Sequence, residues 1–399
     1  MSRRFLVVYC GLLMTVSAFS IDIVLPAFDL MIEDFGSPVE RVQLTIPIYM
    51  LGLGLSQIFF GPASDRFGRR PMILAGLSIY FCGALICTVA PNVETVLAGR
   101  LVQGLGGGAG QVIARAIVRD RFSGSELVQN MAVVTAIFAI GPVVAPLLGY
   151  ALLSFHAWQT AFVAMLVFGA GLGALAWRSS ETLARPSPEA LQPRELKRRA
   201  ARVLGHPQSR WFLLLSAVAM MSIMAYLTQA PLLFVDALGA SKLAFVVYFA
   251  LSGAGIVVGQ IANRRLIARL GAVSASITGA VVLAASATSV LVLDVLGLLT
   301  PLTLCACMTA FNTSYLVVYA NAVSLVLDPH GAIAGFTASF VGFAGPVVAA
   351  SVVVPLTFWI DGRVVPWGLF MLAVSLGCLA MLLVWRGRAG RLIEAQPQE

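Results

Sequence analysis

Charge is the scarcest property of this 399-residue chain. Only 11% of its residues are charged, whereas soluble domains carry about 25%. Six cysteines are too sparse for a disulfide scaffold, and neither an H-E-x-x-H metal motif nor a G-x-x-x-x-G-K-[ST] phosphate loop occurs. The low charge excludes a soluble globular enzyme, and the missing phosphate loop argues against a nucleotide-driven pump. What the chain has in abundance is apolar residues, 59% of the total, with a mean hydropathy of +0.92. This composition is that of an integral membrane protein.

Long apolar runs divide the chain into twelve predicted membrane-spanning helices. About 20 apolar residues are needed to cross roughly 30 Å of hydrocarbon, and uniformly apolar runs of this length favour helices over barrel strands. The predicted spans are 5–28, 42–62, 71–90, 95–114, 128–150, 159–177, 211–235, 244–262, 273–292, 297–319, 333–355 and 367–385. Every cysteine falls inside a span, and we expect all of them to be small buried hydrophobes: Cys10, Cys82, Cys87, Cys305, Cys307 and Cys378.

The basic residues predict the orientation of these spans. If the N-terminus lies inside, 22 of the 26 lysines and arginines fall in inside segments, and only Arg41, Lys242 and Arg363 fall outside. Cytoplasmic segments carry such an excess, so we expect a multi-pass protein of the cell inner membrane with both termini in the cytoplasm. The net charge of +8 is therefore a topology signal and predicts no nucleic-acid partner.

Two sequence repeats indicate that the chain is built from two related halves. The residues Gly141-Pro142-Val143-Val144-Ala145 recur as 345–349, and the pattern Gly61-x-x-x-Asp65-Arg66 has an echo at 259–264. The longest polar stretch lies between the sixth and seventh spans. We therefore predict an all-α membrane protein with two pseudo-symmetric six-helix bundles, 1–178 and 211–385, a cytoplasmic linker at 179–210 and a cytoplasmic tail at 386–399. Parallel halves with a site between them are typical of transporters.

Asp22 and Arg100 are the charged residues that fall well inside predicted spans. A charge at the centre of a spanning helix costs about 2.5–3.5 kcal/mol on insertion scales, so each is a functional candidate. We interpret Asp22 as a proton-binding carboxyl, and Arg100 as part of a cavity wall that interacts with a nearby carboxylate. The alternatives are that Asp22 is hydrated near the outer end, and that the glycine-rich stripe around Arg100 serves helix packing.

A cluster of turn-forming and charged residues follows the second span. It reads Gly61-Pro62-Ala63-Ser64-Asp65-Arg66-Phe67-Gly68-Arg69-Arg70. Glycine permits tight turns, and an aspartate among cations forms charge-assisted hydrogen bonds to neighbouring helices. We expect a turn that latches the cytoplasmic side closed and releases when the halves move; the alternative is a simple topology anchor.

These residues resemble known motifs of the major facilitator superfamily. The segment 61–70 matches the signature G-x-x-x-D-R-x-G-R-R at every fixed position, and Arg100, with Gln103 and Gly104, is similar to the fourth-span motif implicated in proton handling. Gly141 and Pro142 resemble the fifth-span motif of exporters. The resemblance implies gating roles for the following residues: Gly61, Asp65, Arg66, Gly68, Arg69, Arg70, Gly141 and Pro142.

The first span points to one group within that superfamily. Asp22 with Leu25-Pro26 resembles the first-span motif of twelve-span drug:proton antiporters, and the residues 43–57 resemble the bicyclomycin and chloramphenicol resistance branch. Met14 stands where some multidrug members carry a second acid, so cation binding and proton binding would both rest on Asp22 or on residues elsewhere. A pocket with one acid and one arginine suits neutral or anionic amphiphiles at least as well as cations.

A pocket between the halves would also need apolar walls with a few orienting polar groups. Polar or aromatic residues within spans of both halves are candidates for binding substrate: Phe19, Tyr49, Gln111, Tyr226, Gln229, Asn312 and Tyr315. We predict a monomeric, proton-coupled efflux transporter for small amphipathic compounds, with no cofactor and no metal. A proton symporter or uniporter that imports a metabolite is the alternative of the same class, and an intramembrane enzyme the alternative of another.

Overall fold

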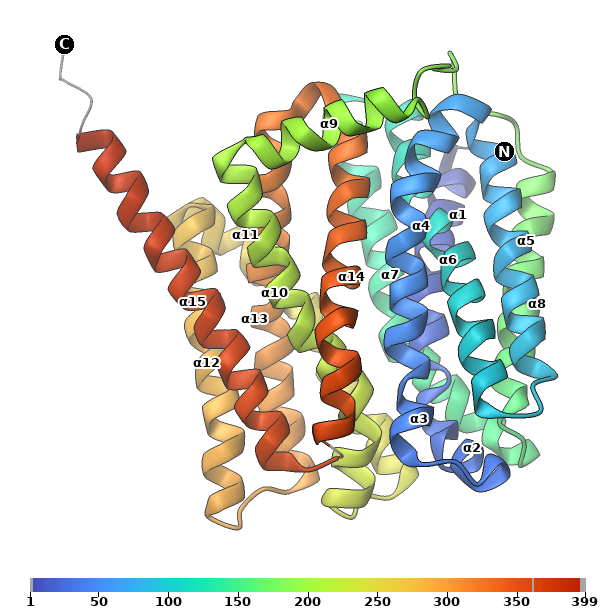
Figure 1. Ribbon diagram of the computed structural model, residues 1–399, viewed down its shortest axis with the longest axis vertical. Helices are drawn as coiled ribbons and strands as arrows, with labels where there is room; N and C mark the ends of the chain where they lie inside the picture. The colour runs from blue at the N-terminus through green and yellow to red at the C-terminus, as the bar shows by residue number, and fades with distance from the viewer. Residues whose placement is uncertain (1–2, 361, 395–399) are drawn as a thin grey trace.

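The computed structural model describes residues 3–360 and 362–394, and it is helical nearly throughout (Figure 1). The six long helices of the N-terminal half are α1 (Arg3–Asp22), α4 (Thr45–Phe67), α5 (Arg69–Thr88), α6 (Val93–Arg121), α7 (Gly124–Leu152) and α8 (Gln159–Trp177). Those of the C-terminal half are α10 (Pro207–Pro231), α11 (Lys242–Leu270), α12 (Ala272–Val295), α13 (Pro301–Leu327), α14 (Ala334–Ile360) and α15 (Val364–Glu394). The predicted tail residues 395–399 lie outside the described residues.

The described residues contain ten stretches that are long and apolar enough to cross a membrane. One of them, Pro301–Ile360, comprises both α13 and α14. The glycine-rich helix α6 is not among the ten, because its glycines and charged residues lower its hydropathy. Together these helices match the twelve predicted spans, so the predicted fold class is confirmed.

Two predicted spans are interrupted in the structure. The first, predicted as one helix over 5–28, ends as α1 at Asp22 and continues through a 3-10 turn, Leu25–Ala27, into the short helix α2 (Phe28–Phe35). Pro26 has no N–H to donate, which favours such a break. The seventh span changes from α10 to a π-helical segment at Leu232–Ala237 after Pro231. The sequence stays apolar through both interruptions, so hydropathy alone does not reveal them.

The predicted turn at 61–70 is mostly helix. Gly61–Phe67 is the last part of α4, Arg69 begins α5, and Gly68 alone separates them with φ of 102°. This left-handed conformation favours glycine. The expectation that all of 61–70 forms a turn was therefore wrong, because one glycine is enough to reverse the chain direction here.

Small residues bring helices of the same half into close contact. Gly104 on α6 packs against the Tyr49 carbonyl of α4, and Gly106 and Gly83 bring the backbones of α5 and α6 together in the same way. In the C-terminal half, Gly259 lies against the Thr313 carbonyl of α13. Membrane helices associate through such small residues, because lipid offers no hydrophobic driving force between helices.

Two helix pairs carry the contact between the halves: α4 with α14, and α7 with α11. The predicted linker contains the helix α9 (Pro193–Gly205), which crosses one end of the molecule at the top of Figure 1 and contacts α10 and α14. We call this end the linker end. The opposite end, which carries α2 and the short helix α3 (Val39–Gln43), we call the far end. The residue boundaries assigned to the two bundles stay a prediction.

The cysteines divide by position on the helix surface. Cys10, Cys87, Cys305 and Cys378 are buried, as expected, but Cys82 is exposed and Cys307 is half-buried. The prediction for those two was wrong because location within a span does not determine whether a side chain faces protein or lipid.

A buried histidine joins the linker to the turn between α13 and α14. The Nε2 atom of His330 lies 2.9 Å from the Ser209 hydroxyl, and the His206 ring lies 5.6 Å from the His330 ring between centroids. Burial, together with the nearby charges of His206 and Arg202, lowers the pKa of His330 below its ordinary value of 6.5. The folded state therefore favours the neutral form of the His330 imidazole.

This lowered pKa predicts a loss of stability in acid. Below pH 6.5 the unfolded chain binds a proton at His330 more readily than the folded chain does. The contribution of neutral His330 to the free energy of unfolding is therefore complete above about pH 6.5, and it is lost as the pH falls toward the folded-state pKa. We expect the thermal midpoint of the purified protein to fall between pH 7 and pH 5, and to fall less in His330→Gln. His156→Gln, in a loop at the far end, should behave like the wild type; equal pH dependence in both variants would contradict the assignment.

Candidate functional site

Asp22 occupies the break in the first span. It is the last residue of α1 and only 3% exposed. Gly149 on α7 lies against the carbonyl of the next residue, Ile23, so α7 packs directly onto the break. Among the described residues, no donor forms a hydrogen bond or ion pair with the Asp22 carboxyl. The structure thus places the predicted residue in a buried position without a partner.

A tyrosine of the other half lies in the same region as this carboxyl. Tyr226 of α10 lies within electrostatic range of Asp22. Its hydroxyl lies 2.7 Å from the Ser252 hydroxyl, and its ring stacks on Phe249 at 5.7 Å between centroids. Asn312 of α13 donates to the Ser252 carbonyl at 3.0 Å, and its Oδ1 atom has no partner among the described residues. Two of the predicted substrate residues therefore lie together with Ser252, which the sequence analysis did not single out.

Arg100 is fully buried, but it does not contact a carboxylate. Its Nε atom donates to the Thr45 carbonyl at 3.1 Å, and its Nη1 atom donates to the Gln103 side chain at 2.7 Å. The guanidinium lies over the Tyr49 ring, 4.3 Å from the centroid, as a cation–π pair. The predicted interaction with a nearby carboxylate was wrong for the described residues. Backbone oxygen and an aromatic face stabilise the cation here, and neither can be recognised from sequence spacing.

Tyr49 belongs to this internal cluster rather than to the interface between the halves. Its hydroxyl lies close to Gly107 of α6 and has no partner among the described residues. Phe19 also packs within its own half, 4.9 Å from the Phe168 ring of α8 between centroids. The structure therefore does not bring these two predicted substrate residues to the α4–α14 contact.

Gln111 lies in a polar chain that reaches the contact between α4 and α14. Its amide donates to the Ser17 hydroxyl at 2.5 Å and accepts from Gln57 at 3.3 Å. The Gln57 side chain in turn lies tightly against Gly342 of α14. This chain connects α1, α6 and α4 to the C-terminal half. Ser17 was not predicted; its place beside Gln111 depends on how α1 crosses α6.

The remaining predicted substrate residues contact different partners. Gln229 accepts from the Gln43 amide at 3.1 Å across the halves and from the Gly362 backbone at 3.2 Å. Its own Nε2 atom has no partner among the described residues. The Tyr315 hydroxyl donates to the sulfur of Met220 at 3.3 Å. Gln229 is therefore a contact between the halves at the far end, whereas Tyr315 packs within the C-terminal half.

The predicted gating residues form a network at the linker end. Arg69 is 6% exposed and donates to Asp65 at 2.5 Å, to Ser64 at 2.7 Å and to Asp120 of α6 at 2.9 Å. These contacts join α4, α5 and α6 within one half. The Asp65 carbonyl also accepts from the Ser187 amide of the linker at 2.8 Å. Arg66 lies outside the network, with its guanidinium over the neighbouring Phe67 ring.

Glu181 of the linker completes the network, although the sequence analysis missed it. Its carboxylate accepts from the backbone amides of Arg69 at 2.9 Å and Arg70 at 3.0 Å, at the N-terminus of α5. Partial burial opposes ionisation of this carboxyl, but the backbone hydrogen bonds outweigh it and hold the pKa of Glu181 below its ordinary value. A carboxylate is stabilised at a helix N-terminus. Arg70 itself donates to the Trp177 carbonyl at 2.6 Å.

Gly141 and Pro142 lie where α7 meets two other helices. Gly141 faces Thr15 and Ala18 of α1, and Pro142 faces Gly253 of α11 in the other half. Proline inside α7 removes a backbone hydrogen bond and favours bending. The repeat that the sequence analysis found therefore falls, in this copy, at a contact between the halves.

Comparison with known proteins identifies the family. The model of the Major Facilitator Superfamily matches residues 10–350. The chain belongs to the major facilitator superfamily. It is therefore a multi-pass membrane transporter, and members of this superfamily carry small molecules.

Individual members of the superfamily extend this result. An uncharacterized MFS-type transporter, YdgK of Bacillus subtilis, is 30% identical over 96% of this chain and 95% of its own length. A bicyclomycin resistance protein homolog of Haemophilus influenzae is 27% identical over 66% of each chain. A solved D-xylose-proton symporter has a TM-score of 0.77 at 14% identity, covering 94% of this chain and 97% of its own. The last similarity shows a shared major facilitator fold.

Proposed function

We propose that this transporter is a proton-coupled antiporter of the cell inner membrane that exports small amphipathic compounds by alternating access. The observation that carries the proposal is the buried, unpartnered carboxyl of Asp22, with Tyr226 of the other half within electrostatic range. The similarity to a bicyclomycin resistance protein homolog supports efflux as the direction. The distribution of arginines supports a cytoplasmic linker end.

The carboxyl supplies the coupling because its charge is costly in this position. A charge at the centre of a membrane span costs about 2.5–3.5 kcal/mol, and no partner among the described residues compensates the charge of Asp22. Binding a proton removes the charge, so the protonated and ionised forms favour different arrangements of the two halves around it. Substrate binding shifts the same equilibrium between the arrangements of the two halves. Proton binding therefore changes the affinity for substrate, and substrate binding changes the affinity for the proton by the same factor.

Alternating access requires that contacts at the two ends break in turn. At the far end these contacts are the Gln43–Gln229 hydrogen bond and the Asp29–Lys242 ion pair of 3.2 Å. At the linker end Gly61 of α4 lies against Ser339 of α14. These named contacts are small and polar or glycine-mediated, so in our proposal they are the ones that break first at each end.

The network around Arg69 gives the linker end its rigidity. It joins α4, α5, α6 and the linker through Asp65, Asp120 and Glu181. In our proposal these helices move as one unit. The network controls the opening of the linker end because it holds Gly61 in position against Ser339 of α14. Gly141 and Pro142 act at the second contact, where α7 bends against α11.

The substrate binds, in our proposal, where the halves meet near Asp22. Tyr226 and Asn312 provide an aromatic face and an unpartnered amide oxygen, and Gln111 and Gln229 provide polar groups toward either end. One carboxyl that cycles through a neutral form, among aromatic and amide groups, suits neutral amphiphiles. Binding in an apolar pocket with a few orienting polar groups is typical of small-molecule sites.

Reconstitution into proteoliposomes tests this function. With a pH-sensitive dye in the lumen and an imposed proton gradient, we expect bicyclomycin or chloramphenicol to move against the proton flux, and collapse of the gradient by an ionophore to stop that movement. One elementary charge moved through 100 mV provides about 2.3 kcal/mol, roughly a 50-fold concentration ratio. Movement of either compound with the protons would show symport, and movement that ignores the gradient would show a uniporter; both results contradict the proposal.

A further inference from the structure

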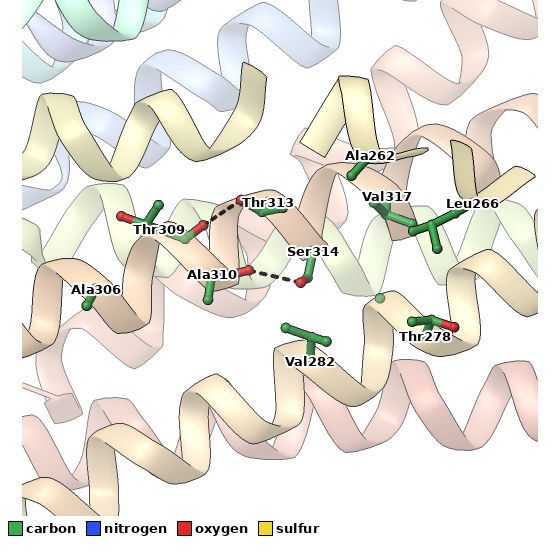
Figure 2. Close-up of a pocket in the computed structure, with 11 residues that line it drawn as sticks. Ala262, Leu266, Thr278, Val282, Ala306, Thr309, Ala310, Thr313, Ser314 and Val317 are labelled. Atoms are coloured by element: carbon green, nitrogen blue, oxygen red, sulfur yellow. Dashed lines mark hydrogen bonds between the residues drawn. The ribbon is translucent and has the colours of Figure 1, made fainter. Parts of the chain in front are cut away.

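A groove on the outer flank of the C-terminal half lies away from the contact between the halves. It has a volume of about 560 Å³. Three helices line it, α11, α12 and α13, as Figure 2 shows for most of its residues. The lining residues are Ala262, Leu266, Thr278, Gly279, Val282, Ala306, Thr309, Ala310, Thr313, Ser314 and Val317. We propose that this groove binds one acyl chain of an anionic phospholipid, whose phosphate is held by Arg265 and Arg269.

The floor of the groove presents an apolar surface although it contains hydroxyl groups. Thr309 donates to the Cys305 carbonyl and Thr313 to the Thr309 carbonyl, both at 2.8 Å, and Ser314 donates to the Ala310 carbonyl at 2.9 Å; the dashed lines in Figure 2 mark the bonds of Thr313 and Ser314. Hydroxyls bonded in this way need no further partner. An occupant of the groove therefore needs no polar group, and a hydrocarbon chain can fill it without leaving these hydroxyls unbonded.

The groove has the length of one membrane leaflet. Its floor on α13 runs from Ala306 to Val317, which is about 16 Å at 1.5 Å per residue. One leaflet contributes roughly half of the 30 Å hydrocarbon core. On α11, the wall residue Leu266 lies four residues before the end of the helix at Leu270, so the groove opens toward the linker end. On α13 the floor lies around the middle of the helix, five residues after its start at Pro301 and ten before its end at Leu327, and a single acyl chain that enters from the linker end fits its length.

Two arginines lie at this opening. At about 100° per residue around the axis of α11, Leu266 lies about 40° from Ala262 on the groove wall, Arg269 about 20° and Arg265 about 60°. All three therefore lie on the side of α11 that borders the groove. Arg265 and Arg269 are both exposed, and neither forms an ion pair or hydrogen bond among the described residues. Basic residues beside the hydrocarbon boundary attract anionic lipid headgroups. Their charge and position match a phosphate at the top of a chain that fills the groove.

Arg264 provides a matched control on the same helix turn. It is exposed, carries the same charge and also lacks an ion pair among the described residues. Its rotation from Ala262 is about 160°, so it faces away from the groove. Diffuse attraction of the linker end to anionic lipid would depend on Arg264 as much as on Arg269, whereas a site at the groove would not.

Native mass spectrometry of the full chain in detergent tests the site. Titration with phosphatidylglycerol and phosphatidylcholine of the same acyl chains should show preferential binding of one phosphatidylglycerol, on the order of tenfold. We expect R269Q and R265Q each to remove most of this preference and R264Q to keep it. A310L, which fills the floor, should weaken both lipids; each variant must elute as a folded monodisperse species.

The possible results separate the proposal from its alternatives. Equal loss of preference in R264Q and R269Q would show diffuse electrostatic attraction and would overturn the site. Unchanged binding in A310L would place the lipid outside the groove and would also overturn it. Competition by inorganic phosphate alone that is as effective as lipid would show a headgroup site without the acyl chain. None of these measurements depends on transport, so they are independent of the proposed function.

Discussion

Replacement of Asp22 by asparagine is expected to abolish proton-driven transport while the protein still inserts and folds. The asparagine side chain has the same size but carries no exchangeable charge, so it mimics the protonated carboxyl permanently. Because Asp22 has no bonded partner among the described residues, the substitution breaks no hydrogen bond or ion pair, and its structural cost is small. We expect gradient-driven accumulation in vesicles to fall by more than about tenfold, the result expected when one coupling step is lost.

Glu33→Gln is the matched control for this variant. Glu33 is a carboxylate of the same span region, on α2, and it is exposed. Its neutralisation should leave transport and its pH dependence unchanged. Exchange of substrate across the membrane without a gradient should persist in Asp22→Asn, because the halves can still move. Wild-type accumulation in Asp22→Asn, with an unchanged response to pH, would remove Asp22 as the coupling residue.

The substitution Gly104→Val is expected to have the largest effect on stability. The Cβ atom of any side chain there would collide with the Tyr49 carbonyl oxygen and come 2.9 Å from the Leu53 amide nitrogen. Both obstacles are backbone atoms of α4, so no rotamer change relieves them, and the two helices must separate. Overpacking costs typically 1–3 kcal/mol and more when backbone must shift, so we expect a loss of at least about 3 kcal/mol.

The same displacement would disturb the Arg100 cluster. Arg100 on α6 bonds to the Thr45 carbonyl and lies over the Tyr49 ring, and both partners belong to α4. Thermal unfolding in detergent measures the stability. Gly173→Val on α8 is the control, because a Cβ atom there meets nothing within 4 Å. Equal midpoints for the two variants would show that α4 and α6 do not need the close approach seen at Gly104.

Part of the site was predictable from sequence because its motifs are local. The segment 61–70 predicted that Asp65 bonds to a neighbouring helix, and Asp65 at the end of α4 does pair with Arg69 at the start of α5, because only Gly68 separates the two helices. Asp120 and Glu181 were not predicted, although both bind the same segment. They lie 51 and 112 residues from Arg69 along the chain, and no local pattern relates such distant positions. The linker contains three glutamates, Glu181, Glu189 and Glu195, and no local pattern distinguishes Glu181 from the other two.

The sequence by itself determined that the chain spans a membrane with twelve helices, and which superfamily it belongs to. Hydropathy is summed along the chain, so it needs no knowledge of neighbouring helices. The tertiary structure alone decided which groups the buried charges meet. Arg100 lies over an aromatic ring instead of beside a carboxylate, and Asp22 is buried without a partner among the described residues, within electrostatic range of Tyr226 of the other half. The crossings of the helices, which depend on glycine contacts such as that of Gly104 with Tyr49, bring these residues together.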